Sequence, residues 1–293
     1  MEVITAETAG FCFGVERAVE EALQAAEKIK KDRAASDSGS PSVYTCGPIV
    51  HNESVIRMLE GKGVHAVTDE KETEDLPKDS TILIRAHGIP KELEERLRKK
   101  GCRIIDATCP FVKKIHRIAE KNAEGGRLVL IAGDETHPEV KGIRSYAGQD
   151  SIVISSPEDL ERICIDKQRK MCLVAQTTFN HKNYKKIVEK IKVLGYNANV
   201  ADTVCSATRE RQEEAADLSS RADVMIVIGG KDSSNSQKLY EICRNNCNRT
   251  YFIQTAADLN DTWWCGVNIV GITAGASTPK TIIKEVQTNV RKF

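Results

Sequence analysis

The sequence predicts an α/β protein of three similar small domains with mostly parallel sheets, arranged about a pseudo-threefold axis. Short β-branched runs alternate with helical patterns of ten or more residues, which is typical of βα units. Cys12, Cys109 and Cys205 are separated by 97 and 96 residues, and 88 residues follow the last of them. Each cysteine stands where an extended apolar segment gives way to an amphipathic helix, so one structural unit is expected three times.

The elements follow this repeat in chain order. Domain 1–108 is expected to contain strands 2–6, 43–46 and 81–85, helix 15–31, and a solvated Ser- and Lys-rich excursion over 32–42. Domain 109–204 is expected to contain helix 112–123 and strands 127–132, 151–155 and 171–176. Domain 205–293 is expected to contain helix 208–220, strands 223–229, 250–254 and 268–273, and a C-terminal helix.

The composition excludes several classes of protein. With 40% hydrophobic and 29% charged residues, the chain is typical of globular proteins. Its 43 Lys and Arg against 42 Asp and Glu create no global field for nucleic acid or membranes. No apolar run approaches the roughly 20 residues that span a bilayer. Ten cysteines without a signal-peptide pattern indicate a reducing compartment, and we expect a cytoplasmic protein.

Each predicted domain offers one cysteine and two polar loops that follow strands. In parallel α/β sheets, ligands bind beyond the carboxyl ends of the strands. We therefore expect one central cavity that collects the polar side chains of all six loops. These are His51 and His87 in the first domain, His137, Glu139 and Thr177 in the second, and Ser233, Ser234, Asn235 and Ser277 in the third.

The three repeated cysteines predict a metal site. Thiolates are favoured at helix N-termini and bind soft metals. Iron-sulfur clusters usually take four cysteines, so three would leave one iron with an open position. Zinc also accepts three thiolates and water, so the ligand set alone does not choose the metal.

The remaining loop residues predict an anionic ligand. Segment 229–236, Gly-Gly-Lys-Asp-Ser-Ser-Asn-Ser, opens a helix, and free amides at a helix N-terminus bind phosphate or diphosphate. The spacing of a P-loop is absent, so ATP is not supported. Ser277 and three histidines would add donors around the anion. Glu139 in a closed cavity near negative charge would keep its proton and act as a general acid, with Thr177 orienting that proton.

These motifs closely resemble the LytB family of 4-hydroxy-3-methylbut-2-enyl diphosphate reductases, over essentially the whole chain. The matching motifs stand in the family's order. They are Gly10-Phe11-Cys12-Phe13-Gly14, Val50-His51-Asn52, Ala86-His87-Gly88, Ala107-Thr108-Cys109-Pro110, His137-Pro138-Glu139, Gln176-Thr177-Thr178, Cys205 with Arg211-Gln212, Ser233-Ser234-Asn235-Ser236 and Ala274-Gly275-Ala276-Ser277.

The resemblance implies a trefoil around a 4Fe-4S cluster held by Cys12, Cys109 and Cys205, with the fourth iron open. It implies two-electron reductive dehydroxylation of the substrate to isopentenyl and dimethylallyl diphosphate, the last step of the non-mevalonate isoprenoid pathway. Glu139 would be the proton donor and Thr177 would hold the hydroxyl. The diphosphate would be bound by His51, His87, His137, Ser233, Ser234, Asn235 and Ser277. Electrons would come from reduced ferredoxin or flavodoxin, because no dinucleotide fingerprint occurs.

The other cysteines have simpler interpretations. Cys46, Cys102, Cys164 and Cys172 lie in or beside strand-like runs and are core candidates. Cys243 and Cys247 stand one helical turn apart, and an incidental pair is favoured over a second metal site, because no other ligands cluster nearby.

Two other functions compete with the reductase. One is a cluster-bearing sensor, which would need no proton relay such as Glu139 and Thr177 beside an anion site. The other is a zinc hydrolase of phosphate esters. Anaerobically purified protein should be brown if it carries an iron-sulfur cluster and colourless if it carries zinc.

Overall fold

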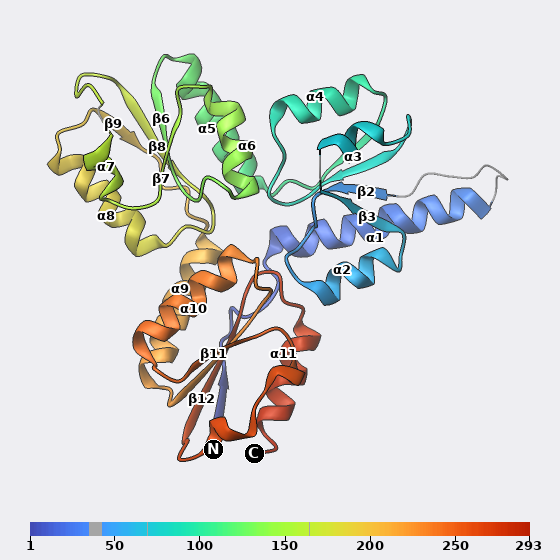
Figure 1. Cartoon of the computed structure of the whole chain (residues 1–293), viewed down its shortest axis with the longest axis vertical. Coiled ribbons are helices and arrows are strands. Elements are labelled where there is room, and N and C mark those ends of the chain that lie inside the picture. Colours follow the sequence, from blue (N-terminus) through green and yellow to red (C-terminus); the bar gives the residue numbers. More distant parts are fainter. Residues whose placement is uncertain (35–42, 69, 164) are drawn as a thin grey trace. The chain divides into compact units, whose positions relative to one another are not determined.

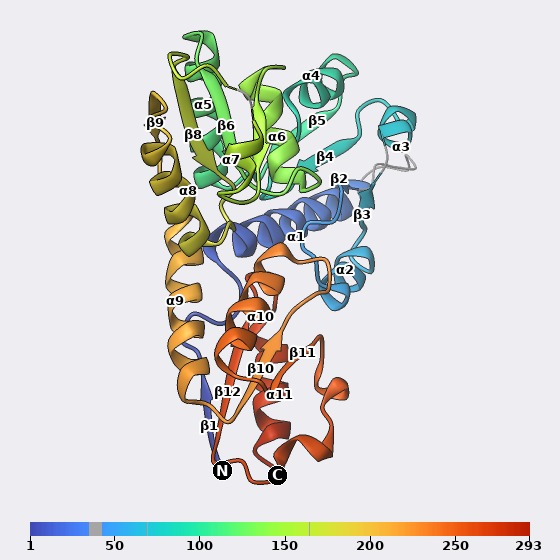
Figure 2. The same cartoon turned by 60° about the vertical axis from the view of Figure 1, so that its left-hand side comes forward.

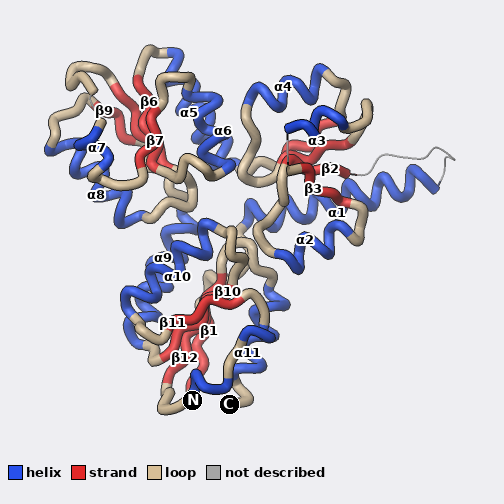
Figure 3. Tube along the Cα trace, viewed as in Figure 1, coloured by secondary structure: helices blue, strands red, loops and turns tan. Residues whose placement is uncertain are grey.

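The computed structural model describes residues 1–34, 43–68, 70–163 and 165–293. The strands form three four-stranded sheets, and every strand pair in them is parallel. Figure 3 shows the strands of each sheet in red, with blue helices beside them. The predicted α/β class with three small parallel sheets is confirmed. The expected trefoil around a cluster stays a prediction.

The chain divides into two compact units. The first unit comprises Met1–Glu16, Val50–Met58 and Ser206–Phe293, and it holds one sheet. The second comprises Arg17–Ile49 and Leu59–Cys205, and it holds the other two sheets. The domain boundaries expected after residues 108 and 204 stay a prediction.

The sheet of the first unit joins the two ends of the chain. Its order is β1 (Glu2–Thr5), β12 (Ile269–Ala274), β10 (Val224–Ile228) and β11 (Thr250–Ile253). β1 pairs with β12 from Glu2 opposite Ile269 to Thr5 opposite Ile272, and Figure 2 shows the two strands running alongside each other. The loop that leads to Cys12 therefore begins at the edge of a sheet built otherwise from the last third of the chain.

Helices cover both faces of this sheet. They are α9 (Ser206–Arg221), α10 (Ser234–Asn246) and α11 (Lys280–Val290), with 3-10 helices η1 (Ala256–Asp258) and η2 (Asp261–Trp264). Side chains alternate across a strand, so Ile226 packs with Val286 of α11, and Met225 packs with Leu218 and Leu239 of α9 and α10. Figure 1 shows α9 and α10 on one side of these strands and α11 on the other.

The second unit holds two sheets of the same kind. One has the order β3 (Val64–Val67), β2 (Val43–Cys46), β4 (Thr81–Ile84) and β5 (Arg103–Asp106). The other has the order β7 (Ile152–Ile154), β6 (Leu128–Ala132), β8 (Met171–Ala175) and β9 (Ala198–Val200). The remaining helices are α1 (Phe13–Ala34), α2 (Glu53–Glu60), α3 (Glu70–Asp75), α4 (Lys91–Lys99), α5 (Pro110–Glu124), α6 (Pro138–Ala147), α7 (Asp159–Arg162) and α8 (His181–Val193).

Helices cover both faces of the central strands β6 and β8. Leu130 and Leu173 pack with Ile187 of α8, whereas the alternate residues of the same strands pack with α5 and α6. All five residues of β6 and all five of β8 are buried, which explains their continuous apolar sequences. This packing fixes the two helices that begin at Cys109 and at His137.

The expected strands are all present, with small differences in their bounds. Three strands were not expected, namely β3, β5 and β9. Helix α1 continues to Ala34, so the start of the expected excursion over 32–42 is helical, and its remainder, 35–42, lies outside the described residues. Across the described residues, no helix combines the length and apolarity that a bilayer crossing needs.

Candidate active site

The three repeated cysteines all stand at the start of a long helix, as predicted. Cys12 directly precedes α1, Cys109 is the N-cap of α5, and Cys205 directly precedes the first residue of α9. None of the three takes part in a disulfide within the described residues, and all three are half-buried. The positive end of the helix dipole favours a negative sulfur at such a position.

Cys12 belongs to the first unit, and Cys109 and Cys205 belong to the second. Among the described residues, no three His, Cys, Asp or Glu side chains form a group that could hold a metal ion. The joint ligation of one cluster by Cys12, Cys109 and Cys205 therefore stays a prediction.

Backbone hydrogen bonds tie two of the cysteines to the predicted polar loops. The Cys205 amide donates to the carbonyl oxygen of Thr177 at 3.1 Å. The Cys109 amide donates to the carbonyl oxygen of Ala86, the neighbour of His87, at 3.0 Å. Cys109 and Cys205 are thus each anchored to a loop that carries a predicted site residue.

Two arginines hold the peptides that lead into the cysteines, a feature that the sequence reasoning did not assign. In the first unit, the buried Arg211 of α9 donates from Nη2 to the carbonyl oxygens of Thr8 at 2.6 Å and Gly10 at 2.8 Å. In the second unit, Arg17 of α1 donates to the carbonyl oxygen of Thr108 at 2.6 Å. The sequence signal that could have indicated this role is an arginine on the apolar face of an amphipathic helix, as Arg211 is on α9.

The loop before Cys12 also depends on a glycine. Gly10 has φ +106°, a conformation that L side chains rarely adopt. A Cβ at this position would lie 3.0 Å from Cδ1 of Ile283. The glycine lets the chain turn from β1 into α1 and places Cys12 at the start of the helix.

Glu139 and Thr177 form a buried polar contact in the second unit. The Glu139 side chain is fully buried. The Thr177 amide donates to its Oε1 at 2.7 Å, and the Thr177 hydroxyl donates to its Oε2 at 2.6 Å. Burial raises the pKa of Glu139 from 4.5 to about 7, and the two hydrogen bonds from Thr177 partly oppose this rise. Glu139 can therefore carry a proton near neutral pH, and the cause is burial rather than a neighbouring charge.

His137 and His87 lie next to this contact. His137 is the N-cap of α6, and its Nδ1 accepts a hydrogen bond from the amide of Glu139 at 3.1 Å. In the neutral ring this leaves the proton on Nε2, which can donate to an anion. The rings of His87 and His137 meet edge to face, with centroids 5.3 Å apart. The second unit thus brings together four predicted residues, His87, His137, Glu139 and Thr177.

The first unit builds the predicted hydroxyl-rich loop. Ser233 caps α10, and its Oγ accepts hydrogen bonds from the amide of Ser236 at 3.3 Å and from its hydroxyl at 2.9 Å. The Ser277 hydroxyl lies 3.4 Å from the same oxygen. Ser233 follows β10 and Ser277 follows β12, which are neighbouring strands. Ser236, which was not among the predicted contacts, is fully buried and organises this loop.

His51 and Asn235 complete this part of the site. A Cβ on Gly230 would lie only 1.8 Å from the carbonyl oxygen of His51, so glycine there lets the two loops touch. The Nδ2 atom of Asn235 is buried and has no hydrogen-bond partner among the described residues. Ser234, the first residue of α10, is half-buried. A buried amide donor, hydroxyl groups and a helix N-terminus together suit an anion.

Of the other described cysteines, five lie in the interior and Cys265 is exposed. Cys46, Cys102, Cys172, Cys243 and Cys247 are all buried. The thiols of Cys243 and Cys247 contact backbone carbonyl oxygens, and burial raises the pKa of Cys243 to about 12. Cys164 lies outside the described residues.

Comparisons with known proteins identify the family of the chain. The family model described as LytB protein matches residues 3–291. The chain is 43% identical, over all of its length and 98% of the relative, to the 4-hydroxy-3-methylbut-2-enyl diphosphate reductase of Caldanaerobacter subterraneus subsp. tengcongensis.

Two solved structures are similar as well. One, of (E)-4-hydroxy-3-methyl-but-2-enyl diphosphate reductase, the terminal enzyme of the non-mevalonate pathway, is 39% identical, with all of both chains covered and a TM-score of 0.69. The other, of the E-1-hydroxy-2-methyl-but-2-enyl-4-diphosphate reductase from Plasmodium falciparum, is 28% identical, with 99% of this chain and 87% of that chain covered and a TM-score of 0.87. The chain described here belongs to the LytB protein family.

Proposed function

We propose that the protein is a 4-hydroxy-3-methylbut-2-enyl diphosphate reductase that performs the last step of the non-mevalonate isoprenoid pathway. The carbon-oxygen bond of the allylic alcohol breaks, two electrons and two protons are taken up, and water leaves. The products are isopentenyl and dimethylallyl diphosphate. The buried Glu139–Thr177 contact carries the proposal, because it holds a transferable proton at neutral pH.

The residues present fit an iron-sulfur centre. Cys12, Cys109 and Cys205 are half-buried cysteines at helix N-termini, and cysteine thiolates are the usual ligands of such clusters. When bound, a 4Fe-4S cluster with one iron not ligated by cysteine would supply the electrons and a Lewis acid for the departing hydroxyl.

The protein's own side chains supply the proton and the diphosphate site. Protonated Glu139 gives its proton to the departing hydroxyl, and Thr177 orients both the carboxyl group and the substrate oxygen. The diphosphate is held by hydroxyl, amide and imidazole donors and by the N-terminus of α10. These donors are His51, His87, His137, Ser233, Ser234, Asn235 and Ser277.

The electrons come from reduced ferredoxin or flavodoxin. The sequence has no dinucleotide fingerprint, so a nicotinamide cofactor bound to the chain itself is not supported. A separate carrier protein is therefore the expected physiological source of the two electrons of each turnover.

Anaerobic turnover of the hydroxylated diphosphate with dithionite tests this function. The expected result is consumption of substrate and formation of both isoprenyl diphosphates, identified by NMR. A brown, iron-loaded protein that leaves the substrate unchanged would refute the reductase, as would a colourless zinc protein that hydrolyses phosphate esters.

A further inference from the structure

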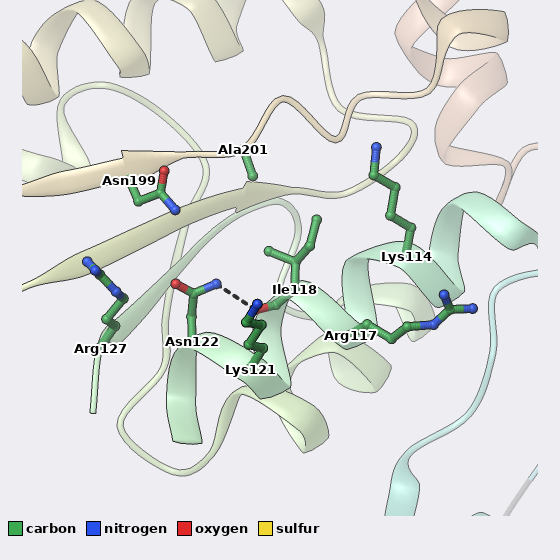
Figure 4. Close-up of a pocket in the computed structure, with 8 residues that line it drawn as sticks. All are labelled: Lys114, Arg117, Ile118, Lys121, Asn122, Arg127, Asn199 and Ala201. Carbon is green, nitrogen blue, oxygen red and sulfur yellow. Dashed lines mark hydrogen bonds between the residues drawn. The ribbon is translucent and has the colours of Figure 1, made fainter. Parts of the chain in front are cut away.

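A basic hollow lies on the second unit between helix α5, the start of β6 and the edge strand β9. We call this depression the basic hollow, and its charged and amide-bearing lining residues define it. Its volume is about 590 Å³. Figure 4 shows the long cationic side chains of α5 along one side and Asn199 of β9 across from them. Its polar lining residues are Lys114, Arg117, Lys121, Asn122, Arg127 and Asn199.

The cations of this hollow come mainly from one stripe of α5. Lys114, Arg117 and Lys121 are spaced three and four residues apart, which places them on one face of a helix. All three are exposed, and Arg127 joins them from the start of the next strand. Four positive side chains therefore border one depression, although the whole chain has a net charge of only +1.

Two charges of α5 outside the hollow are paired, whereas the cations that line it and the exposed Glu124 at the end of the helix form no ion pair among the described residues. Lys113 pairs with Asp106 at 2.5 Å, and Glu120 pairs with Lys91 at 2.6 Å. Within the described parts of the chain, no carboxylate lines the hollow or forms an ion pair with its four cations. The helix thus concentrates uncompensated positive charge on one face, which attracts an anionic partner.

Two simpler explanations for the cations of the hollow fit the structure less well. Exposed lysines often serve only solubility, as Lys185 and Lys186 on α8 can do. Cations also protect edge strands from pairing. Natural edge protection places the charge on the strand itself, but β9 consists of Ala198, Asn199 and Val200, and the cations come from the helix opposite.

The hollow is connected to the proposed redox centre by a single rigid element. Helix α5 begins at the residue after Cys109. With a rise of 1.5 Å per residue, Lys114 lies about 8 Å and Lys121 about 18 Å along the axis from that cysteine. An electron carrier bound at the hollow would therefore contact α5, the helix that begins directly after the proposed iron ligand Cys109.

We propose that the basic hollow is the docking surface for an acidic electron-transfer protein that reduces the enzyme. This rests on the proposed function. In each turnover the reduced carrier loses two electrons, one or two at a time according to its cofactor. The substrate gains them with two protons as its carbon-oxygen bond breaks and water is released. Charge complementarity at such a surface raises the association rate and makes it depend on salt.

The experiment compares two electron donors with one set of variants. Reduced flavodoxin, a small acidic flavoprotein, is the protein donor, and dithionite is the chemical donor. The test variant reverses three charges of the hollow, and a matched control reverses three charges on α8. The variants are Lys114→Glu with Arg117→Glu and Lys121→Glu, and Lys182→Glu with Lys185→Glu and Lys192→Glu.

The test variant should raise the KM for flavodoxin about tenfold or more at low salt. This effect should shrink as salt is added. Its turnover with dithionite and its cluster absorbance should stay within about twofold of the unmodified protein, and the control variant should match the unmodified protein throughout. The corresponding triple Gln variant should give a smaller rise in KM, because it removes attraction without adding repulsion.

Three results would count against the docking surface. They are an unchanged KM for flavodoxin in the test variant, an equal rise in the α8 control, and an equal loss with both donors. A different result separates the two proposals. If the unmodified, iron-loaded protein fails to turn over with dithionite, the proposed function itself is refuted.

Discussion

Replacing Thr177 by valine should move the pH dependence of turnover by changing the pKa of Glu139. Valine keeps the size of the side chain and leaves the backbone amide in place, so the 2.7 Å hydrogen bond to Oε1 survives. Only the 2.6 Å hydrogen bond from the hydroxyl to Oε2 is lost. That bond favours the ionised carboxylate and holds its pKa down.

The size of the shift follows from the lost hydrogen bond. A hydrogen bond to a charged group contributes about 1.5–3 kcal/mol. One pKa unit corresponds to about 1.4 kcal/mol. Without the hydroxyl, the pKa of Glu139 should therefore rise from about 7 by a further one to two units, roughly.

The assay is kcat as a function of pH between about 6 and 9.5, with a chemical reductant in excess. A general acid works only while protonated, so the rate should fall as pH rises through its pKa. In Thr177→Val that fall should occur about one to two units higher, whatever the loss in absolute rate.

Thr178→Val is the matched control. The hydroxyl of Thr178 accepts a hydrogen bond from Nε2 of Gln176 at 2.9 Å. Its profile should coincide with that of the unmodified protein. An unmoved midpoint in Thr177→Val, or an equal shift in both variants, would refute the role of the Thr177 hydroxyl.

Three further predictions follow from the same contacts. Glu139→Gln should abolish turnover while keeping cluster absorbance. Because the pKa of Glu139 is raised from 4.5 to about 7 in the folded state, the unmodified protein loses stability as pH rises through that window. The free energy of unfolding of the variant should therefore exceed that of the unmodified protein by up to about 3 kcal/mol at pH 8 and equal it below pH 4. Undiminished turnover would remove Glu139 as the acid. Arg211→Met breaks the hydrogen bonds to Thr8 and Gly10, so chemical denaturation should show a free energy of unfolding lower by about 2–4 kcal/mol. The cluster absorbance should also bleach faster in air than in the control Glu210→Gln, on the exposed side of α9. Equal bleaching rates in the two variants would contradict the role of Arg211 in holding the loop before Cys12. Ser277→Ala should weaken diphosphate binding about tenfold in calorimetry, and an unchanged Kd would exclude its contact.

The sequence predicted all the central strands but only three of the six edge strands, for a physical reason. Strands β4, β6, β8 and β10 are buried on both faces and have continuous apolar sequences. The three unexpected strands, β3, β5 and β9, are all at the edges of their sheets. These strands are partly exposed, as Arg103–Asp106 and Ala198–Val200 show, so their sequence patterns resemble those of loops.

The features of the candidate site also divide into those that local sequence predicts and those that depend on contacts between distant segments. The positions of the cysteines at helix starts and the cap at Ser233 follow from local sequence, because a helix N-terminus has recognisable signals. The Glu139–Thr177 contact joins residues 38 apart and was expected from their loops. The hydrogen bonds from Arg211 to Thr8 and Gly10 join residues about 200 apart in sequence. They depend on the pairing of β1 with β12, which local sequence patterns do not encode.

The most direct test of a shared iron-sulfur centre is the iron content and visible absorbance of single Cys→Ser variants purified without oxygen. Cys12→Ser, Cys109→Ser and Cys205→Ser should each lose most of the absorbance, because one cluster needs all three sulfurs. Cys243→Ser, in the packed core, should keep it. Full absorbance in all three single variants would contradict ligation by these cysteines.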